Sequence, residues 1–340
     1  LHSPTTSTEN IAIGTDALRG TSASTAQYNV AIGNYALDAV TNAGYNISIG
    51  RESLTANTTG DTNVAIGYQA GMTNTDGNDN TLIGHKAGKT INGGTGRNVM
   101  VGSMAGQSAT TTDSSTIIGW QAVGGAALTG DYNTAVGYQA GYALVGGVEG
   151  SVLLGHRAGY GATSGGYNTF LGYAAGQNVT TGAGNVAIGK NAGPSSTNTD
   201  SNKLYIHNAA GTPLIGGDFS AGTVTINGVL SATAKSFNIE HPLYKDKRLV
   251  HGSLEGPEHG IYIRGTIEAS KGCVIELPDY WQAMCDEYTV QLTPHGPYTV
   301  FIQEKHKDKV MIASSNKDYK FDYFIVGKRT DEEFEVVQDA

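Results

Sequence analysis

A phrase of nine residues recurs along roughly the first 210 residues of this 340-residue chain. It reads NVAIGYQAG at 63–71, NVAIGNYAL at 29–37 and NVAIGKNAG at 185–193. Its glycine returns after 19 residues and then after every 17 or 18: Gly14, Gly33, Gly50, Gly67, Gly84, Gly102, Gly119, Gly137, Gly155, Gly172 and Gly189. Because a fixed period is the signature of stacked structural units, this repeat constrains the fold more than any other feature.

The length of the unit favours a β-solenoid. A helical solenoid unit needs about 33 residues, which is far more than this period provides. In NVAIG the Val and Ile alternate with a small Ala, as in a strand, and the segments between copies, such as TANTTGDT, are rich in turn-forming residues. We therefore expect 11–12 coils, each with two strands of about five residues, stacked at about 4.8 Å into a rod about 50 Å long.

The repeated residue types predict how coils contact each other. An Asn four residues before the glycine can bond the next coil and its own turn, and the glycine can adopt turn conformations closed to other residues. We predict that the Ile before the glycine points inward and packs on its copies. Two coils represent these structural positions: Asn63, Ile66, Gly67, Asn185, Ile188 and Gly189.

The repeat resembles a known family. NVAIG followed by AG or AL is similar to the YadA-like head repeat of trimeric autotransporter adhesins, and such repeats also occur in phage tail fibres. The resemblance implies an all-β, left-handed parallel β-roll that assembles as a homotrimer. The coil is a few residues longer than the usual unit, which predicts a longer turn on one face. A thin coil also buries little apolar area, so lateral association is expected on physical grounds.

Composition and charge limit the kinds of partner that this chain can bind. The net charge of −9 and the absence of a basic stripe argue against nucleic acid as a partner. No run of 18 apolar residues is present, so we expect no membrane insertion. The chain begins at Leu1 without a signal pattern, which we interpret as a piece of a longer protein whose missing N-terminal part contacts other tail proteins.

Three segments differ in composition. Residues 1–211 hold the repeats, and 212–234 contain two β runs, TPLIGGDF and GTVTINGVLSA, that resemble the connector of fibre proteins and would register three chains. In 235–340 only 7 glycines remain while 31 residues are charged and 13 are aromatic, so this segment can bury a core of its own.

The last segment reads as an antiparallel β domain with one helical turn in PDYWQAMCDE. Eight short runs have strand composition: KSFNIE, RLVHGSL, GIYIRGTIE, CVIEL, YTVQLTP, YTVFIQE, KVMIAS and KFDYFIVGKR. The phrases GSLEGPE and ELPDYW resemble the C-terminal domain of tail-fibre proteins from marine phages, especially those that infect cyanobacteria. This resemblance implies a virion structural protein.

Aromatic residues are the candidates for receptor contact. For Tyr280, Trp281 and Tyr298, core packing is the simpler interpretation, but if one ring contacts a receptor we expect a surface Trp281 at the distal tip. In the repeats, aromatic residues near the glycine form a column that either stacks on sugar rings or lies at a subunit seam, the interpretation we favour. These residues are Tyr68, Trp120, Tyr138, Tyr160 and Tyr173.

We expect no catalytic, cofactor or metal site. Glu255 and Glu258 are the only conspicuous carboxylate pair for glycan cleavage, and a turn in which they cap backbone amides or pair with Arg248 or Arg264 is the simpler interpretation. A disulfide between the two cysteines, Cys273 and Cys285, is possible in an oxidising compartment, but ordinary thiols are favoured.

Together these patterns predict the trimeric shaft of a phage tail fibre, located in the virion, whose distal domain binds a host cell-surface glycan or protein. Two alternatives stay open. One is a bacterial trimeric adhesin at the cell surface, and the other is a glycan-degrading tailspike.

Overall fold

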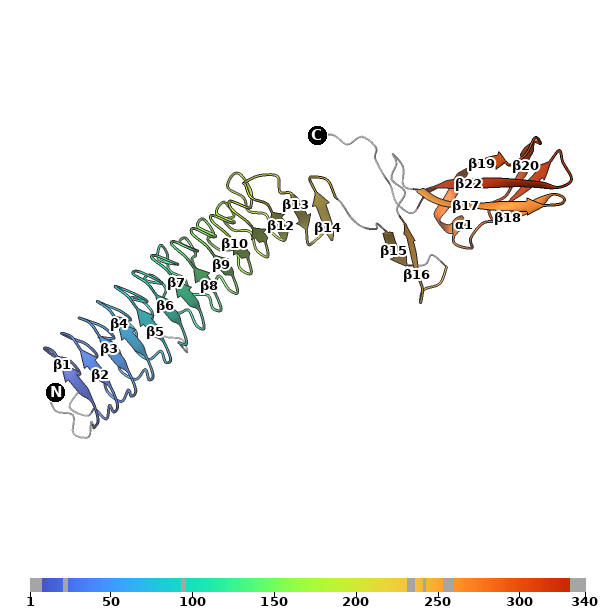
Figure 1. Ribbon diagram of the computed structural model, residues 1–340. Helices are drawn as coiled ribbons and strands as arrows, with labels where there is room; N and C mark the ends of the chain where they lie inside the picture. Colours follow the sequence, from blue (N-terminus) through green and yellow to red (C-terminus); the bar gives the residue numbers. More distant parts are fainter. Residues whose placement is uncertain are drawn as a thin grey trace. The chain divides into compact units, whose positions relative to one another are not determined.

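The computed structural model describes residues 8–20, 24–92, 96–230, 236–240, 243–252 and 260–330. The chain divides into two compact units, Leu1–Leu230 and Ser231–Ala340. The first is a parallel β-solenoid and the second consists of small antiparallel sheets (Figure 1). The predicted all-β fold is confirmed.

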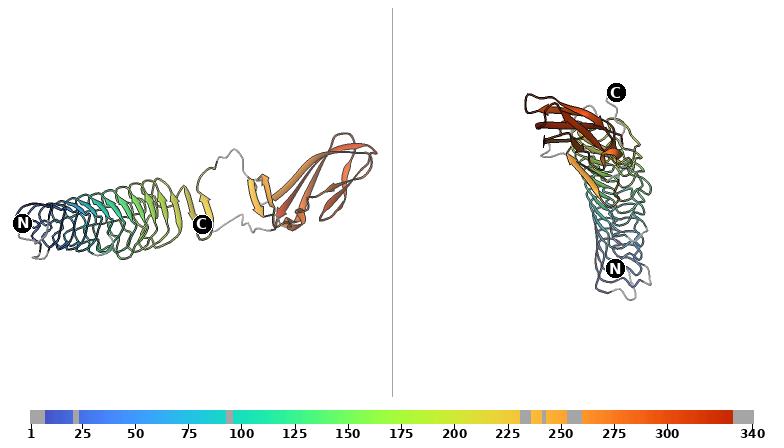
Figure 2. Two further views of the ribbon diagram at one scale, coloured as in Figure 1. Left: turned by 90° about the horizontal axis from the view of Figure 1, so that it is seen from below. Right: turned by 90° about the vertical axis from the view of Figure 1, so that its right-hand side faces the viewer.

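The repeats form a solenoid of about eleven coils, stacked one on the next in both views of Figure 2. Neighbouring strands pair in parallel and in register, so that Val64, Ala65 and Ile66 lie beside Ile47, Ser48 and Ile49. In the described part of the repeats, each coil contributes one three-residue strand: β1 (Ile11–Ile13), β2 (Val30–Ile32), β3 (Ile47–Ile49), β4 (Val64–Ile66), β5 (Thr81–Ile83), β6 (Val99–Val101), β7 (Thr116–Ile118), β8 (Thr134–Val136), β9 (Val152–Leu154), β10 (Thr169–Leu171) and β11 (Val186–Ile188).

The expectation of two five-residue strands per coil is wrong. Opposite the short strand, the described residues pair only through isolated bridges, such as Asn78 with Gly96. The cause lies in the phrase after the strand, where Gly67, Gln69 and Gly71 all have positive φ, at 137°, 56° and 59°. A strand cannot continue through left-handed residues, so the chain turns instead.

The prediction that Ile66 and Ile188 point inward is also wrong. In β4 the middle residue, Ala65, is fully buried, while Val64 and Ile66 are only half-buried. The same pattern holds in β11, where Ala187 is the buried residue. Successive strand residues point to opposite faces, so a three-residue strand that places its small centre in the narrow interior places both flanking aliphatic residues outside.

Interior volume is shared between the strand centre and the turn that follows. In the coils of Leu82 and Met100 the strand centre is large, and the fourth residue after the repeat glycine is glycine, Gly88 and Gly106. A Cβ at Gly88 would lie 2.8 Å from Leu82 Cδ2, and one at Gly106 would lie 2.5 Å from Met100 Sδ. In these two coils the missing Cβ leaves room for the large strand centre in a close-packed core.

The asparagine column bonds successive coils, as predicted. The side chain of Asn63 is fully buried, and its Nδ2 donates to Gly77 O at 2.8 Å. Its Oδ1 accepts the backbone N–H of Asn80 at 3.0 Å. Asn185 repeats the arrangement, because its N–H donates to Asn168 Oδ1 at 2.9 Å and its own Oδ1 accepts from the N–H of Lys203, also at 2.9 Å.

The repeat glycines are required for two reasons. Gly67 and Gly189 have φ of 137° and 119°, in a region that residues with a Cβ rarely adopt. A Cβ on Gly67 would also collide with the carbonyl oxygen of Gly84 in the next coil. The predicted special role of these glycines is confirmed.

The parallel stack ends in a hairpin. β12 (Lys203–Ile206) is parallel to β11, whereas β13 (Ile215–Asp218) and β14 (Thr223–Ile226) continue the same sheet in antiparallel pairing. Gly222, with φ of 66°, lies in the turn between β13 and β14. The two β runs of the expected connector are therefore the last two strands of the solenoid sheet.

The second unit contains, within its described residues, all eight expected strands and the helical turn. β15 (Ser236–Glu240) pairs with β16 (Arg248–Gly252). One three-stranded sheet has the order β17 (Gly260–Ala269), β22 (Tyr319–Arg329), β19 (Cys285–Pro294). The other has the order β18 (Cys273–Glu276), β21 (Lys309–Ser314), β20 (Val300–Lys305), and α1 (Trp281–Met284) connects β18 to β19.

These two three-stranded sheets share one apolar core. Ile261, Phe321 and Ile325 of the first sheet cluster with Val310 and Ile312 of the second, and all five are at most 2% exposed.

Both cysteines are free thiols, as favoured from the sequence. Burial raises the pKa of the Cys285 thiol to about 11, with a smaller contribution from the Asp286 carboxylate.

Candidate functional site

The sheet β17–β22–β19 has one face in the core and one face open to solvent. Strand alternation determines which residues lie on each side, because Ile263, Val290 and Phe321 pack in the core and their neighbours point away. We call the open side the outer sheet face. Its central residues are Arg264, Thr266, Gln291, Thr293, Asp322 and Phe324.

The sheet register arranges these residues in two rows. Arg264 and Gln291 flank Phe324 across the strands, and Thr266 and Thr293 flank Asp322. A hollow of about 480 Å³ lies over both rows. A half-buried aromatic ring is therefore surrounded by one guanidinium, one amide, two hydroxyls and one carboxylate.

Hydrogen bonds hold Asp322 in the second row. Its carboxylate accepts a hydrogen bond from Thr266 Oγ1 at 2.6 Å and pairs with His295 Nε2 at 3.0 Å. The hydrogen bond from Thr266, followed by that from His295, holds the pKa of Asp322 below its ordinary value. The negative charge of the hollow is thus already partnered.

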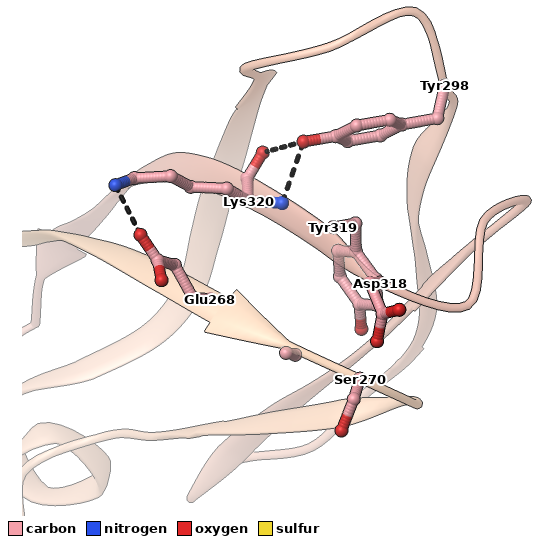
Figure 3. A pocket seen from close by; sticks show the side chains of 7 residues that line it. Glu268, Ser270, Tyr298, Asp318, Tyr319 and Lys320 are labelled. Atoms are coloured by element: carbon pink, nitrogen blue, oxygen red, sulfur yellow. Dashed lines mark hydrogen bonds and ion pairs between the residues drawn. The ribbon is translucent and has the colours of Figure 1, made fainter.

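A second hollow of about 530 Å³ lies at the end of the same sheet (Figure 3). Tyr298 Oη accepts the backbone N–H of Lys320 at 2.7 Å and donates to its carbonyl oxygen at 2.8 Å. The Lys320 ammonium bonds Glu268, which lowers the pKa of this carboxyl. Since these polar groups bond one another, this hollow offers fewer open hydrogen-bonding atoms than the first.

The predicted receptor residues do not form one surface. Tyr298 lines the second hollow, whereas Tyr280 is partly buried and packs against the core. The expectation of a surface Trp281 is wrong, because this ring is 1% exposed and meets Tyr288 edge-on at 6.1 Å between centroids. Helix α1 turns the indole against Gly327, where an added Cβ would lie 3.0 Å from Trp281 Cζ2.

Strand alternation in the sequence indicates the outer sheet face, although the aromatic residues alone do not. In GIYIRGTIE and YTVQLTP every second residue is apolar and faces the core, so the intervening Arg264, Thr266, Gln291 and Thr293 belong to one face. Alternation alone does not reveal that β22 lies between these two strands. For that reason the rows centred on Phe324 and Asp322 emerge only from the sheet order.

The aromatic column of the shaft is present, with one correction. Trp120, Tyr138, His156 and Tyr173 stack in succession with centroids 4.9, 4.9 and 4.7 Å apart. Tyr160 belongs to another column and stacks on Tyr142. Within the main column each ring covers the face of the next, so the inner members present their edges to solvent. Sugar stacking needs an open ring face, which disfavours that role for these rings.

Tyr68 lies in the same position of its own coil and stacks on His85, with centroids 5.6 Å apart. The guanidinium of Arg51 lies 5.9 Å from the Tyr68 centroid on the preceding coil. Ser103 follows His85 at this position and precedes Trp120, so the two aromatic stacks are separate along the shaft.

The outer side of the shaft strands carries aliphatic residues. Several are more than a third exposed in the single chain: Ile11, Ile13, Ile47, Ile118, Val152, Leu154 and Leu171. Because the strands pair in register, these residues repeat along the stack at about 4.8 Å. Contiguous apolar surface of this kind on a polar rod is typical of a protein interface.

The remaining candidate sites are a carboxylate pair, a metal centre and a membrane-spanning helix. Glu255 and Glu258 lie outside the described residues. In the part of the chain that the structure describes, no three His, Cys, Asp or Glu side chains gather where they could hold a metal ion. The described helical residues include no helix that is long and apolar enough to cross a membrane.

No protein-family model, curated protein or solved structure matches this chain. The fold and the two hollows are therefore the basis for a functional proposal.

Proposed function

We propose that this chain is the structural and receptor-binding component of a phage tail fibre, a homotrimeric shaft that presents its C-terminal unit to the host cell surface. The observation that carries the proposal is the pairing of two unlike units in one chain. One is a repetitive stack with aliphatic outer rows, and the other has an open sheet face with an aromatic ring among polar groups. The resemblance of the repeat and of the C-terminal phrases to fibre proteins supports it.

The outer rows of the shaft support self-association. In the coil of β4 the interior holds Ala65 and Ala70, while Ile66 lies on the other side of the strand and is only half-buried in its own chain. Fully burying an exposed Ile or Val side chain stabilises a structure by about 1.5–3 kcal/mol, and these half-buried side chains would gain part of that value. Repeated over the coils, this exceeds the association cost of about 4–15 kcal/mol. Three identical chains would cover one another's rows.

The outer sheet face supports recognition of a host glycan or protein. Its hollow combines an aromatic ring with hydrogen-bonding groups, as ligand sites do. Weak contacts of one copy would be multiplied by three copies on a fibre. As part of such a fibre, the protein would lie in the virion, outside the cell.

Two deletions test the proposal. Deleting 63–79 removes one whole repeat, which should shorten the shaft by about 4.8 Å and preserve attachment to host cells, because each coil contacts only its neighbours. Deleting 231–340 should abolish attachment. Attachment of labelled protein to candidate host cells is measured, with light scattering to record assembly. Equal attachment by the chain without 231–340 would place the adhesive surface on the shaft and contradict the proposal.

A further inference from the structure

We propose that the hollow on the outer sheet face binds a carboxylated sugar, such as a uronic acid residue of an acidic polysaccharide. Arg264 would hold the carboxylate, and the Phe324 ring would contact the apolar face of the sugar. The biological use of this site rests on the proposed attachment function, but the binding itself does not.

Arg264 is the group that selects an anion. It lies on the exposed side of β17 and has no ion-pair partner among the described residues. The carboxylate in the same hollow, Asp322, is held by Thr266 and His295. A planar guanidinium binds a planar carboxylate through two parallel hydrogen bonds, so Arg264 is suited to a ligand carboxylate.

The number of charges argues for a carboxylate rather than a doubly charged phosphate group. Arg264 is the only cationic side chain among the residues that line the hollow. Lys320 lies in the neighbouring hollow and is bonded to Glu268. A ligand group with a single negative charge matches this arrangement.

Phe324 and its neighbours fit the body of a sugar. Its ring lies at the centre of the first row and is tilted by 39° against Tyr262, which is 38% exposed. Within the described residues, the side chains of Gln291 and Thr293 make no hydrogen bond, so their amide and hydroxyl groups are open to ligand hydroxyls. The hollow falls within the range of about 300–1,000 Å³ of small-ligand pockets.

The binding test uses the full chain and two sugars that differ only in the carboxylate. Saturation-transfer NMR is recorded with sodium glucuronate and, at equal concentration, with glucose. Glucuronate should give the stronger signal, and Arg264→Gln should weaken its binding about tenfold or more, as expected for loss of a charge-assisted bond. Lys328→Gln is the matched control, because Lys328 is an exposed cation of β22 that does not line the hollow.

The control variant should bind glucuronate as the unmodified chain does. Equal signals from glucuronate and glucose, or unchanged glucuronate binding by Arg264→Gln, would overturn the inference. Cell attachment is measured on the same proteins to separate the two proposals. If the unmodified chain attaches to cells but does not bind glucuronate, the inference fails and the attachment function stands. If glucuronate binding depends on Arg264 but no protein attaches, the inference stands and the attachment function fails.

Discussion

Asn46 Oδ1 accepts two hydrogen bonds from Asn63 in the next coil, from the backbone N–H at 2.9 Å and from Nδ2 at 3.1 Å. Both side chains are fully buried. One side-chain oxygen thus satisfies a main-chain donor and a side-chain donor in a place that water does not reach. The register of neighbouring coils is set by this contact as well as by the strand pairing.

Replacing Asn63 tests this contact. Asn63→Ala removes the acceptor for the N–H of Asn80 and should cost about 1–3 kcal/mol, because a buried donor is left unsatisfied. Asn63→Ser should cost less, since Ser115 at the same position accepts the N–H of Asn133 at 3.1 Å. Urea unfolding followed by circular dichroism measures both. Equal losses for Ala and Ser would show that backbone satisfaction is not the reason for the column.

Gly67→Ala should be among the most damaging small substitutions in the shaft. The added Cβ would collide with the Gly84 carbonyl, and φ of 137° adds strain, so a loss of about 3 kcal/mol or more is expected. Gly147→Ala is the matched control, because nothing lies within 4 Å of its added Cβ and its φ is not in the left-handed region. The control should change stability by less than about 0.5 kcal/mol in the same unfolding measurement. Similar losses for both variants would contradict this explanation.

A pair of aspartate substitutions distinguishes the two faces of β4. Ala65→Asp places a charge in the dry interior and should lower stability by about 3 kcal/mol or more. Ile66→Asp places the charge on the outer row, so the coil should keep its circular dichroism spectrum while self-association weakens. Light scattering follows association, with 35.3 kDa as the mass of one chain. If Ile66→Asp unfolded the protein as much as Ala65→Asp does, Ile66 would have to point to the interior. That result would contradict its assignment to the outer row.

The pH dependence of Asp322 reports on the second row of the outer sheet face. Its pKa is lowered from the ordinary 3.8, so its contribution to folding stability is present above pH 3.8 and is lost as the pH falls through the folded-state pKa. Thr266→Val removes the largest cause and should raise this pKa towards 3.8. NMR titration of the Asp322 carboxyl carbon measures the change. Thr293→Val, on the other side of Asp322, should leave the pKa unchanged, and an equal rise in both variants would exclude the Thr266 hydrogen bond as the cause.

Much of the fold could be predicted from the spacing of a few residue types. The glycine period indicated stacked coils, and the strands of the C-terminal unit followed from alternation and turn residues. The asparagine column was predictable because the same residue recurs at one position of most stacked coils, where its amide can bond the backbone of its own turn and of the next coil. These are local properties, so they can be read without knowing which segments meet.

The direction of Ile66 and the location of Trp281 could not be predicted in the same way. Apolar character suggested that Ile66 faces inward, but in a three-residue strand the middle residue, Ala65, takes the interior position and Ile66 lies on the other side. An aromatic residue beside a helical turn can lie on either side, and only the packing of α1 against Gly327 places the indole in the core.

The sequence by itself determined the repeat, its strand and turn chemistry, and the positions of the glycines that a close approach between coils requires. Only the tertiary structure decided which strand of the C-terminal unit lies between two others, and therefore that Arg264, Phe324 and Gln291 form one row. The physical reason is the range of the interactions. Backbone conformation and alternation depend on neighbouring residues, whereas a binding surface depends on side chains brought together from strands far apart in the chain.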